Sequence, residues 1–398
     1  MPDQESQAVQ DLFGSTKYIN TSGKVSRKPQ PWHRLRKQVV RESQWCEAIE
    51  LILPRLVRTN SNLKYIGLPG SDLLDIRIIH DMICVPNSLS MYFFGFNSEA
   101  RVGHKNQLEA DISLDEVRRL ANIDPNSLVK PDDLASLSND AHVAIEQAQS
   151  QAPFNIVNID LCNGVAKEAP GGQGVSMYNA IAKVIHLQYA AKEPWVFFLT
   201  TRVGEQYNSS DAIDLLLNAY TENLKQCQPF RKSIEEHFGS LYSNLDENSL
   251  KDPEKHFNIF ITSVSKWLIN LGIQSKPPWK VELLKSYSYQ VASGNSHNDI
   301  ASLSYKFTPL VQAPRDKYNL ADLNLGIEIT ECKLAPAIVS IVKGTLDCDK
   351  ELLGNDSLRE TMAENCATLM EKARYNKQEF KRWALNDALR FHQKEIEA

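Results

Sequence analysis

The first half of the chain alternates between short apolar runs and segments with helical spacing. The apolar runs are residues 63–68 (LKYIGL), 90–96 (SMYFFGF), 154–161 (FNIVNIDL) and 195–200 (WVFFLT), with a shorter candidate at 129–133 (VKPDD). Strands buried on both faces form nearly continuous apolar runs, whereas half-buried strands alternate. The segments between the runs, such as residues 177–189, have helical spacing, which predicts the crossover helices that parallel strands need. The pattern predicts a parallel sheet covered by helices on both faces.

The pattern changes after residue 210. Residues 211–273 have helical spacing, and residues 281–291 and 303–307 alternate on either side of a polar turn, which predicts an antiparallel hairpin. We therefore predict an α/β fold: a doubly wound, mostly parallel sheet closed by an antiparallel hairpin, with a helical insertion and a C-terminal helix. The predicted units are a basic N-terminal arm (1–42), a Rossmann-like core (43–210), a helical insertion (211–278), a β-hairpin completing the core sheet (279–312) and a mainly helical C-terminal segment (313–398).

Composition and charge exclude several classes of protein. The 398 residues are 42% hydrophobic and 23% charged, which is typical of a globular protein and not of a disordered chain. A net charge of −5 argues against a uniformly basic nucleic-acid binder. No uncharged apolar run approaches the roughly 18 residues of a membrane span, and the N-terminus lacks the pattern of a secretory signal. We expect a cytoplasmic protein without membrane contact.

Cysteines and histidines give no sign of a metal site. The seven cysteines are scattered without a C-x-x-C pair, and no two of the nine histidines have helical metal-ligand spacing. We predict reduced thiols and no metal.

The N-terminal segment concentrates positive charge. Residues 17–41 contain eight Lys and Arg and no acid. Such a segment can lie on phosphates while an aromatic ring stacks on a base, or it can be solvated or packed against its own domain. The candidate nucleic-acid contacts are Trp32, Arg34, Arg36 and Lys37.

Polar side chains gather where the predicted strands end. In open α/β sheets, ligands bind beyond the carboxyl ends of the strands, next to the tight turn after the first strand. That turn is residues 67–71, Gly-Leu-Pro-Gly-Ser. The ends of later strands contribute Asn97, Glu99, Asp132, Asp133, Asp160 and Arg202. Asp72 and Asp75 follow the turn, where they can complement a helix dipole.

A glycine turn after strand one, polar ends of strands two and four and a closing hairpin resemble the class I S-adenosylmethionine-dependent methyltransferase fold, over residues 63–310. The resemblance implies that the glycine turn lies beside the methionine part of the cofactor, that an acid ending strand two holds the ribose hydroxyls and that an acid after strand three contacts the adenine amine. Carried over, these roles fall on Gly67, Gly70 and Ser71, on Asn97 or Glu99, and on Asp132 or Asp133, with Asp160 near the substrate.

The chain departs from that pattern at three positions. Tyr65 stands where the first-strand acid is expected, Pro69 replaces a glycine and Asn97 replaces the ribose acid unless Glu99 substitutes. The fourth-strand sequence 160–163 lacks the Pro-Pro-aromatic motif, and no Pro-Cys pair occurs, so base methylation of the well-marked kinds is not supported.

Three functions stay open. The first is S-adenosylmethionine-dependent methyl transfer, with Asp160 orienting or deprotonating the acceptor. The second is a degenerate Rossmann scaffold that serves as a binding subunit for a partner protein. The third is nucleic-acid binding through the arm.

The segments PWHRLRKQVVRESQW and YIGLPGSDLLDIR also resemble an uncharacterised bacterial family found among phage-defence and mobile-element genes, which suggests a defence complex. Two local features allow two interpretations each. Cys162 is a candidate nucleophile or a rim residue, and the glycine-rich loop at 171–174 is a lid or a plain connection.

Overall fold

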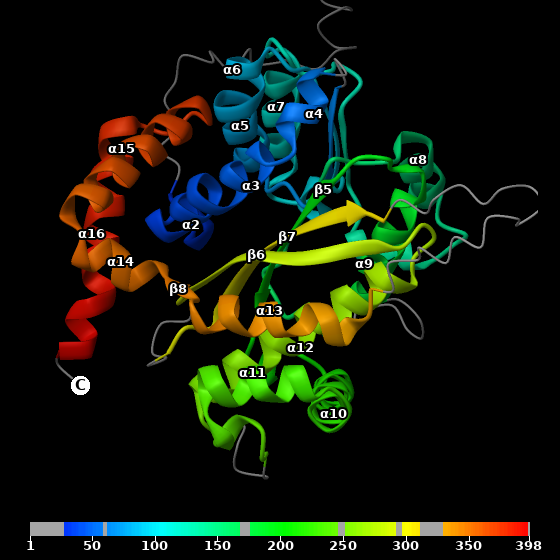
Figure 1. Cartoon of the computed structure of the whole chain (residues 1–398). Helices are drawn as coiled ribbons and strands as arrows, with labels where there is room; N and C mark the ends of the chain where they lie inside the picture. Colours follow the sequence, from blue (N-terminus) through cyan, green and yellow to red (C-terminus); the bar gives the residue numbers. More distant parts are fainter. Residues whose placement is uncertain are drawn as a thin grey trace, which may run out of the picture.

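An eight-stranded mixed sheet runs through the molecule in the computed structural model (Figure 1). The structure describes residues 28–58, 62–167, 176–245, 251–291, 297–310 and 329–396. The strand order is β3-β2-β1-β4-β5-β7-β6-β8. The strands are β1 (Leu63–Gly67), β2 (Met91–Phe96), β3 (Leu128–Lys130), β4 (Ile156–Asp160), β5 (Trp195–Arg202), β6 (Trp279–Tyr289), β7 (Ile300–Pro309) and β8 (Leu346–Asp347).

The predicted α/β class and the hairpin are confirmed. Strands β1 to β5 pair in parallel, as their continuous apolar runs predict. Strand β7 runs antiparallel to both β5 and β6, so the hairpin closes the sheet and makes it mixed. The short β8 adds to β6 in parallel, and no sequence signal pointed to it.

Helices cover both faces of the sheet (Figure 1). The first face carries α2 (Leu35–Val40), α3 (Glu47–Glu50), α4 (Leu53–Arg58), α5 (Leu74–Ile79), α6 (Val85–Asn87), α7 (Gln107–Arg118), α14 (Cys348–Gly354), α15 (Asp356–Lys372) and α16 (Lys377–Ile396). The second face carries α8 (Val143–Gln151), α9 (Met177–Leu187), α12 (Pro253–Gln274) and α13 (Glu331–Lys343), with α10 (Ser210–Gln226) and α11 (Gln228–Phe238) packed outside them.

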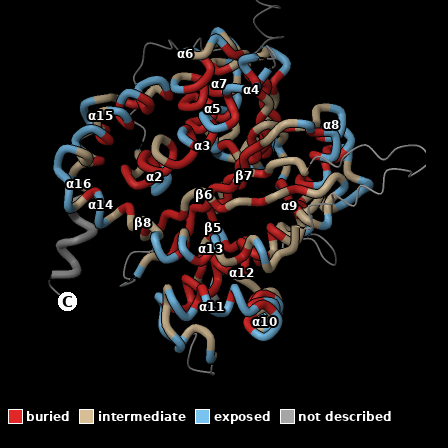
Figure 2. Tube along the Cα trace, in the orientation of Figure 1, coloured by how far each residue is buried: buried red, intermediate tan, exposed pale blue. Residues whose placement is uncertain are grey.

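The two cores follow from the alternation of side chains along the strands. On the first face, Trp45 stacks on Phe198 of β5 with 5.9 Å between ring centroids, and Gln44 donates a hydrogen bond to the carbonyl of Ser302 (2.7 Å). On the second face, Val157 and Leu303 pack among the apolar side chains of α9 and α12. Figure 2 shows buried positions running along the sheet and along the inner sides of these helices.

The N-terminal segment from residue 31 onward is not an arm in solvent. All six residues of α2 are buried, including Arg36 and Lys37, and α2 packs beside α14 and α15 (Figure 1). The apolar residues Leu35, Val39 and Val40 direct the helix inward. Of the two alternatives for this segment, packing against its own domain is the one that the structure bears out for residues 31–42. Residues 1–27 lie outside the described part.

The prediction that all cysteines are reduced thiols is wrong for two of them. Cys227 and Cys332 form a disulfide across 105 residues of sequence, a pairing that depends on how α11 and α13 pack. Among the described residues, no helix is both long enough and apolar enough to cross a membrane.

The packing of Trp45 generates a stability prediction. Trp45→Ala removes a side chain that is 1% exposed, and we expect it to lower the free energy of unfolding by about 3–5 kcal/mol. Trp32→Ala, at a position that is 40% exposed, is the matched control and should cost less than about 1 kcal/mol. Urea unfolding measures both, and equal losses would contradict the description of α2 and its neighbours as the cover of this face.

Candidate functional site

The candidate site lies at the carboxyl edge of β1, β2 and β4. Gly67 at the end of β1 pairs in register with Gly95 of β2 on one side and with Asn158 of β4 on the other. The strand order reverses direction at β1 and β4, which is where open α/β sheets bind ligands. The turn after β1 and the ends of β2 and β4 therefore meet, as the sequence predicts.

The turn after β1 folds back over the neighbouring strands. A Cβ on Gly67 would lie 2.3 Å from the Asn158 carbonyl oxygen, so the close approach of β4 requires glycine there. A Cβ on Gly95 would lie 2.5 Å from Cγ of Pro69, so the proline ring occupies the space above β2. A Cβ on Gly70 would meet no atom within 4 Å, and Gly70 is exposed. Of the two loop glycines, Gly70 borders open space and Gly67 serves the sheet.

Glu99 and Ser71 come together at the mouth of the turn. The Ser71 hydroxyl donates to Oε2 of Glu99 (2.9 Å), and Asn106 Nδ2 donates to the same oxygen (2.8 Å). The Asn97 side chain instead accepts from the backbone N–H of Glu99 (2.9 Å), which caps a 3-10 turn (Ser98–Ala100). Glu99 therefore offers the carboxylate at the end of β2, while the Asn97 carbonyl serves the backbone.

The two acids after β3 lie at the rim. Asp133 is exposed, and its Oδ1 accepts from the backbone N–H of Ala135 (2.9 Å) as the cap of the next 3-10 turn. Asp132 is half-buried. One carboxylate oxygen of Asp133 thus caps the turn.

Asp160 at the end of β4 is held by a buried lysine. Lys37 Nζ lies 2.7 Å from Oδ1 of Asp160 and 3.3 Å from Oγ1 of Thr200, and it sits 4.6 Å from the centre of the Trp45 ring. Lys37 is 3% exposed, and burial lowers its pKa although the Asp160 carboxylate raises it in part. The Asp160 side chain is 26% exposed and is one half of an ion pair. Nothing in the sequence indicated that Lys37, part of a basic run, would pair with Asp160.

A second buried polar pair lies below the turn. The Tyr65 hydroxyl donates a hydrogen bond to Oδ2 of Asp75, and the Asn158 amide lies beside the same hydroxyl. Burial raises the pKa of Asp75, and its Oδ1 has no hydrogen-bond partner among the described residues. Asp75 is thus a buried acid under the turn, and it lies in the first turn of α5, where an acid can complement the helix dipole. Tyr65 stands at the position where an acid is expected in the first strand. Its hydrogen bond places the Asp75 carboxyl group beside that position.

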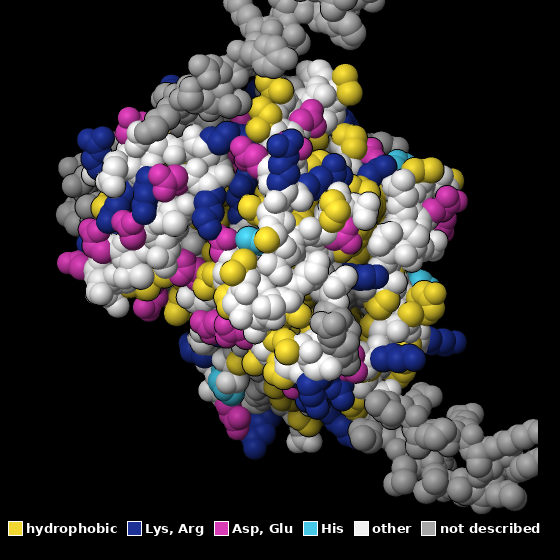
Figure 3. Space-filling model, turned by 90° about the horizontal axis from the view of Figure 1, so that it is seen from above, with side chains coloured by type: hydrophobic (Ala, Val, Ile, Leu, Met, Phe, Trp, Pro, Cys, Tyr) yellow, Lys and Arg dark blue, Asp and Glu magenta, His cyan; other side chains and the backbone are white. Residues whose placement is uncertain are grey.

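The other candidate nucleic-acid contacts also face internal carboxylates. Arg36 Nε lies 2.9 Å from Oδ1 of Asp349, and Arg34 Nε lies 3.2 Å from Oδ2 of Asp387. Trp32 alone of the four candidates is substantially exposed. On the face shown in Figure 3, Lys and Arg side chains are interspersed with Asp and Glu. Arg34, Arg36 and Lys37 therefore form no exposed basic surface.

Cys162 lies just beyond Asp160 and reaches solvent. Partial burial and then the Asp160 carboxylate raise the pKa of its thiol, so Cys162 is protonated near neutral pH and is not an activated nucleophile. Arg202 at the end of β5 donates to the Cys162 carbonyl (3.1 Å) and pairs with Asp299. Within the described residues, no group of three His, Cys, Asp or Glu could hold a metal ion. The glycine-rich loop at 171–174 lies outside the described residues.

Removal of the Lys37 ammonium should leave a carboxylate without its partner. We expect Lys37→Met to lower the free energy of unfolding by about 3 kcal/mol, and Lys37→Met combined with Asp160→Asn to cost less than the sum of the single changes. Lys372→Met is the matched control, because Lys372 also lies 2.7 Å from an aspartate, Asp81, but is 47% exposed, and it should cost less than about 1 kcal/mol. Additive single changes in urea unfolding would show that Lys37 and Asp160 do not interact.

The buried Asp75 should make stability depend on pH. Its folded pKa is raised above the ordinary 3.8, so the stability that its proton contributes is lost as the pH rises through the folded pKa. Asp75→Asn should therefore gain stability relative to the parent protein as the pH increases from 4 to 8.

Asp81→Asn is the control with the opposite sign. Burial opposes ionisation of Asp81, but hydrogen bonds from His80 and Lys372 outweigh it and lower the pKa. Relative to the parent protein, this variant should lose stability as the pH rises toward 3.8 and change little between pH 4 and 8, because the contribution of ionised Asp81 is complete above its unfolded pKa. Parallel pH profiles of the two variants in urea unfolding would contradict the assignment for Asp75.

Comparisons with known proteins place the chain in a family. No curated protein and no solved structure matches it. The model of the PP_RS20740-like family matches residues 26–385, and the chain belongs to that family.

Proposed function

We propose that this chain is a methyltransferase-like protein that binds S-adenosylmethionine at the carboxyl edge of β1, β2 and β4. The observation that carries the proposal is the sheet itself. Five parallel strands in the order β3-β2-β1-β4-β5, followed by the antiparallel β7 and then β6, support the resemblance to the class I methyltransferase fold. The crevice at the reversal of strand order is where such a sheet accepts a nucleoside.

The residues at the mouth of the crevice suit an adenosyl group better than a dinucleotide. The Glu99 carboxylate, beside Ser71, can accept hydrogen bonds from ribose hydroxyls, and Gly70 leaves space next to it. A pyrophosphate instead needs backbone N–H groups at the start of a helix, and here Pro69 has none while the Leu68 N–H bonds to Asn158. Asp132 or Asp133 would serve the adenine amine.

The role of Asp160 follows from its ion pair. S-adenosylmethionine supplies a methyl group on a sulfonium. Because Lys37 holds one oxygen of Asp160, the carboxylate is fixed in orientation, and its exposed part can accept a hydrogen bond from an O–H or N–H acceptor. This arrangement favours orientation of the acceptor over strong general-base catalysis, since the ammonium stabilises the ionised carboxylate.

A second candidate function is that of a scaffold without chemistry, and two contacts favour it. The Pro69 ring fills the space above Gly95, and the Tyr65 hydroxyl lies 2.6 Å from the position of a Cβ on Gly67, so side chains of the protein occupy the space next to both strand ends. Such a scaffold would bind a partner protein.

A setting in bacterial defence and a nucleic-acid target stay predictions that rest on sequence alone.

Cys162 provides the test, because it lies at the crevice and is exposed whereas the four other described free cysteines are buried. We expect S-adenosylmethionine or S-adenosylhomocysteine to slow maleimide labelling of Cys162, by about tenfold at ten times the Kd. Mass spectrometry of the labelled peptides measures the rate, and calorimetry measures the affinity. Asp160→Asn should keep the protection.

Gly70→Trp should abolish the protection by filling the open space, whereas Gly70→Ala should retain it, because its Cβ meets no atom. Unchanged labelling together with no heat of binding at millimolar ligand would sink the cofactor proposal and leave the scaffold.

A further inference from the structure

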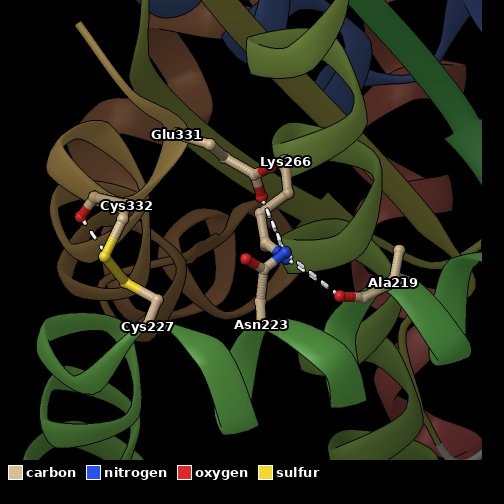
Figure 4. The surroundings of a disulfide bond; sticks show 6 residues. All are labelled: Ala219, Asn223, Cys227, Lys266, Glu331 and Cys332. Carbon is tan, nitrogen blue, oxygen red and sulfur yellow. Dashed lines mark hydrogen bonds and ion pairs between the residues drawn. A yellow bond between two sulfur atoms is a disulfide. The ribbon is translucent and has the colours of Figure 1, made fainter. Parts of the chain in front are cut away.

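Four helices outside the sheet hold the Cys227–Cys332 disulfide. Helices α10 to α13 share a small apolar core of their own, which includes Tyr220, Phe230 and Val339. Cys227 is the corner residue between α10 and α11, and Cys332 is in the first turn of α13 (Figure 4). The disulfide therefore ties the start of α13 to that corner, far from the candidate crevice along the chain.

The two cysteines differ in exposure. Cys227 is 3% exposed, whereas Cys332 is half-buried. Thiol–disulfide exchange requires a thiolate to reach one sulfur in line with the bond, and the other sulfur leaves. A reductant in solution can therefore attack Cys332, and Cys227 is the leaving group.

The backbone of α13 provides a hydrogen-bond acceptor for the reduced state. Pro336 lies four residues after Cys332 inside α13 and has no N–H, so the Cys332 carbonyl lacks the helical donor that it would otherwise have. The Cys227 sulfur lies 3.6 Å from this carbonyl oxygen (Figure 4). In the disulfide that sulfur carries no hydrogen. On reduction the new S–H of Cys227 can donate to the waiting carbonyl, so the reduced pair gains a hydrogen bond that the oxidised pair does not have.

The disulfide also supports a buried ion pair. Glu331, next to Cys332, has its Oε1 3.1 Å from Nζ of Lys266, and Asn223 donates to the same oxygen (2.8 Å) (Figure 4). Lys266 is 2% exposed, donates to the Ala219 carbonyl and has a pKa lowered by burial. An ammonium buried this deeply depends on its carboxylate. If the disulfide opens, Cys332 can move, and Glu331 moves with it. The ion pair between Glu331 of α13 and Lys266 of α12 then weakens.

We propose that Cys227 and Cys332 form a reversible redox-modification site, whose substrate is a dithiol reductant and whose opening loosens the first turn of α13. A thiolate of the reductant attacks the Cys332 sulfur, the S–S bond breaks, and the Cys227 thiolate leaves and takes up a proton. The second thiol of the reductant then displaces Cys332 from the mixed disulfide. Two electrons and two protons pass to the protein, which gains two thiols, and the reductant becomes a disulfide.

The test is a redox titration of the full chain in mixtures of reduced and oxidised dithiothreitol. Differential alkylation with mass spectrometry reads the state of each cysteine, circular dichroism follows the fold, and hydrogen exchange follows the peptide that contains Glu331 and Cys332. We expect reversible opening with the fold retained and with exchange in this peptide at least about fivefold faster. Cys227→Ser/Cys332→Ser should show no redox response.

Pro336→Ala tests the hydrogen-bond argument separately. The alanine N–H would satisfy the Cys332 carbonyl in both states and remove the advantage of the reduced one, so the disulfide should become about fivefold harder to reduce. Pro253→Ala is the matched control, because Pro253 is the first residue of α12, where no helical acceptor waits for an N–H, and it should leave the equilibrium unchanged.

Three results would overturn the proposal: both cysteines alkylated in the native protein without any reductant, reduction that occurs only when the protein unfolds, or equal exchange in the two redox states. None of them bears on cofactor binding, since Cys162 reports on that site independently.

Discussion

Burial of positive charge is the constraint on which the rest of the structure depends. Residues 33–37 lie against the sheet and bring His33, Arg34, Arg36 and Lys37 into or close to the interior. A buried cation costs several kcal/mol unless a carboxylate and hydrogen bonds compensate it. Each of the three cations meets a different aspartate, Asp387 in α16, Asp349 in α14 or Asp160 at the end of β4, and the His33 ring lies 3.2 Å from Asp72 after β1. One short segment therefore requires four distant parts of the chain to converge.

This convergence joins the candidate site to the rest of the molecule. Asp72 follows the turn that borders the crevice, and it also receives a hydrogen bond from Tyr375, between α15 and α16. Asp160 is held from the other side by Lys37. The turn and the strand end are thus both positioned by the N-terminal segment, so the site can be rigid although the turn itself carries a proline and few donors. The same contacts leave little positive charge available to an external polyanion.

The helices on the far side of the sheet follow a different rule. Helices α10 and α11 pack mainly on α12 and α13, and their shared core is small. Small cores need additional ties, and here these are one covalent bond and one buried ion pair. Such a unit can loosen without disturbing the main core, whose largest buried side chains, including Trp45, Trp195 and Trp279, lie elsewhere.

The sequence alone determined the class of fold and the edge at which polar residues gather. Continuous apolar runs predict strands buried between two helical layers, and alternating runs predict a hairpin, so the period of the pattern was sufficient for the class of fold. The period did not show that the polar face of β7, with Ser302 and Ser304, is also buried. Gly67, Ser71, Glu99 and Asp160 were found because parallel strands end at one edge. The tertiary structure decided the partners. That Lys37 would meet Asp160, that Tyr65 would reach Asp75 and that Cys227 would bond to Cys332 depend on separations of 123, 10 and 105 residues. Charge and thiol chemistry are the same for every acid or cysteine along the chain, so only the packing of helices on the sheet selects which pairs come within reach.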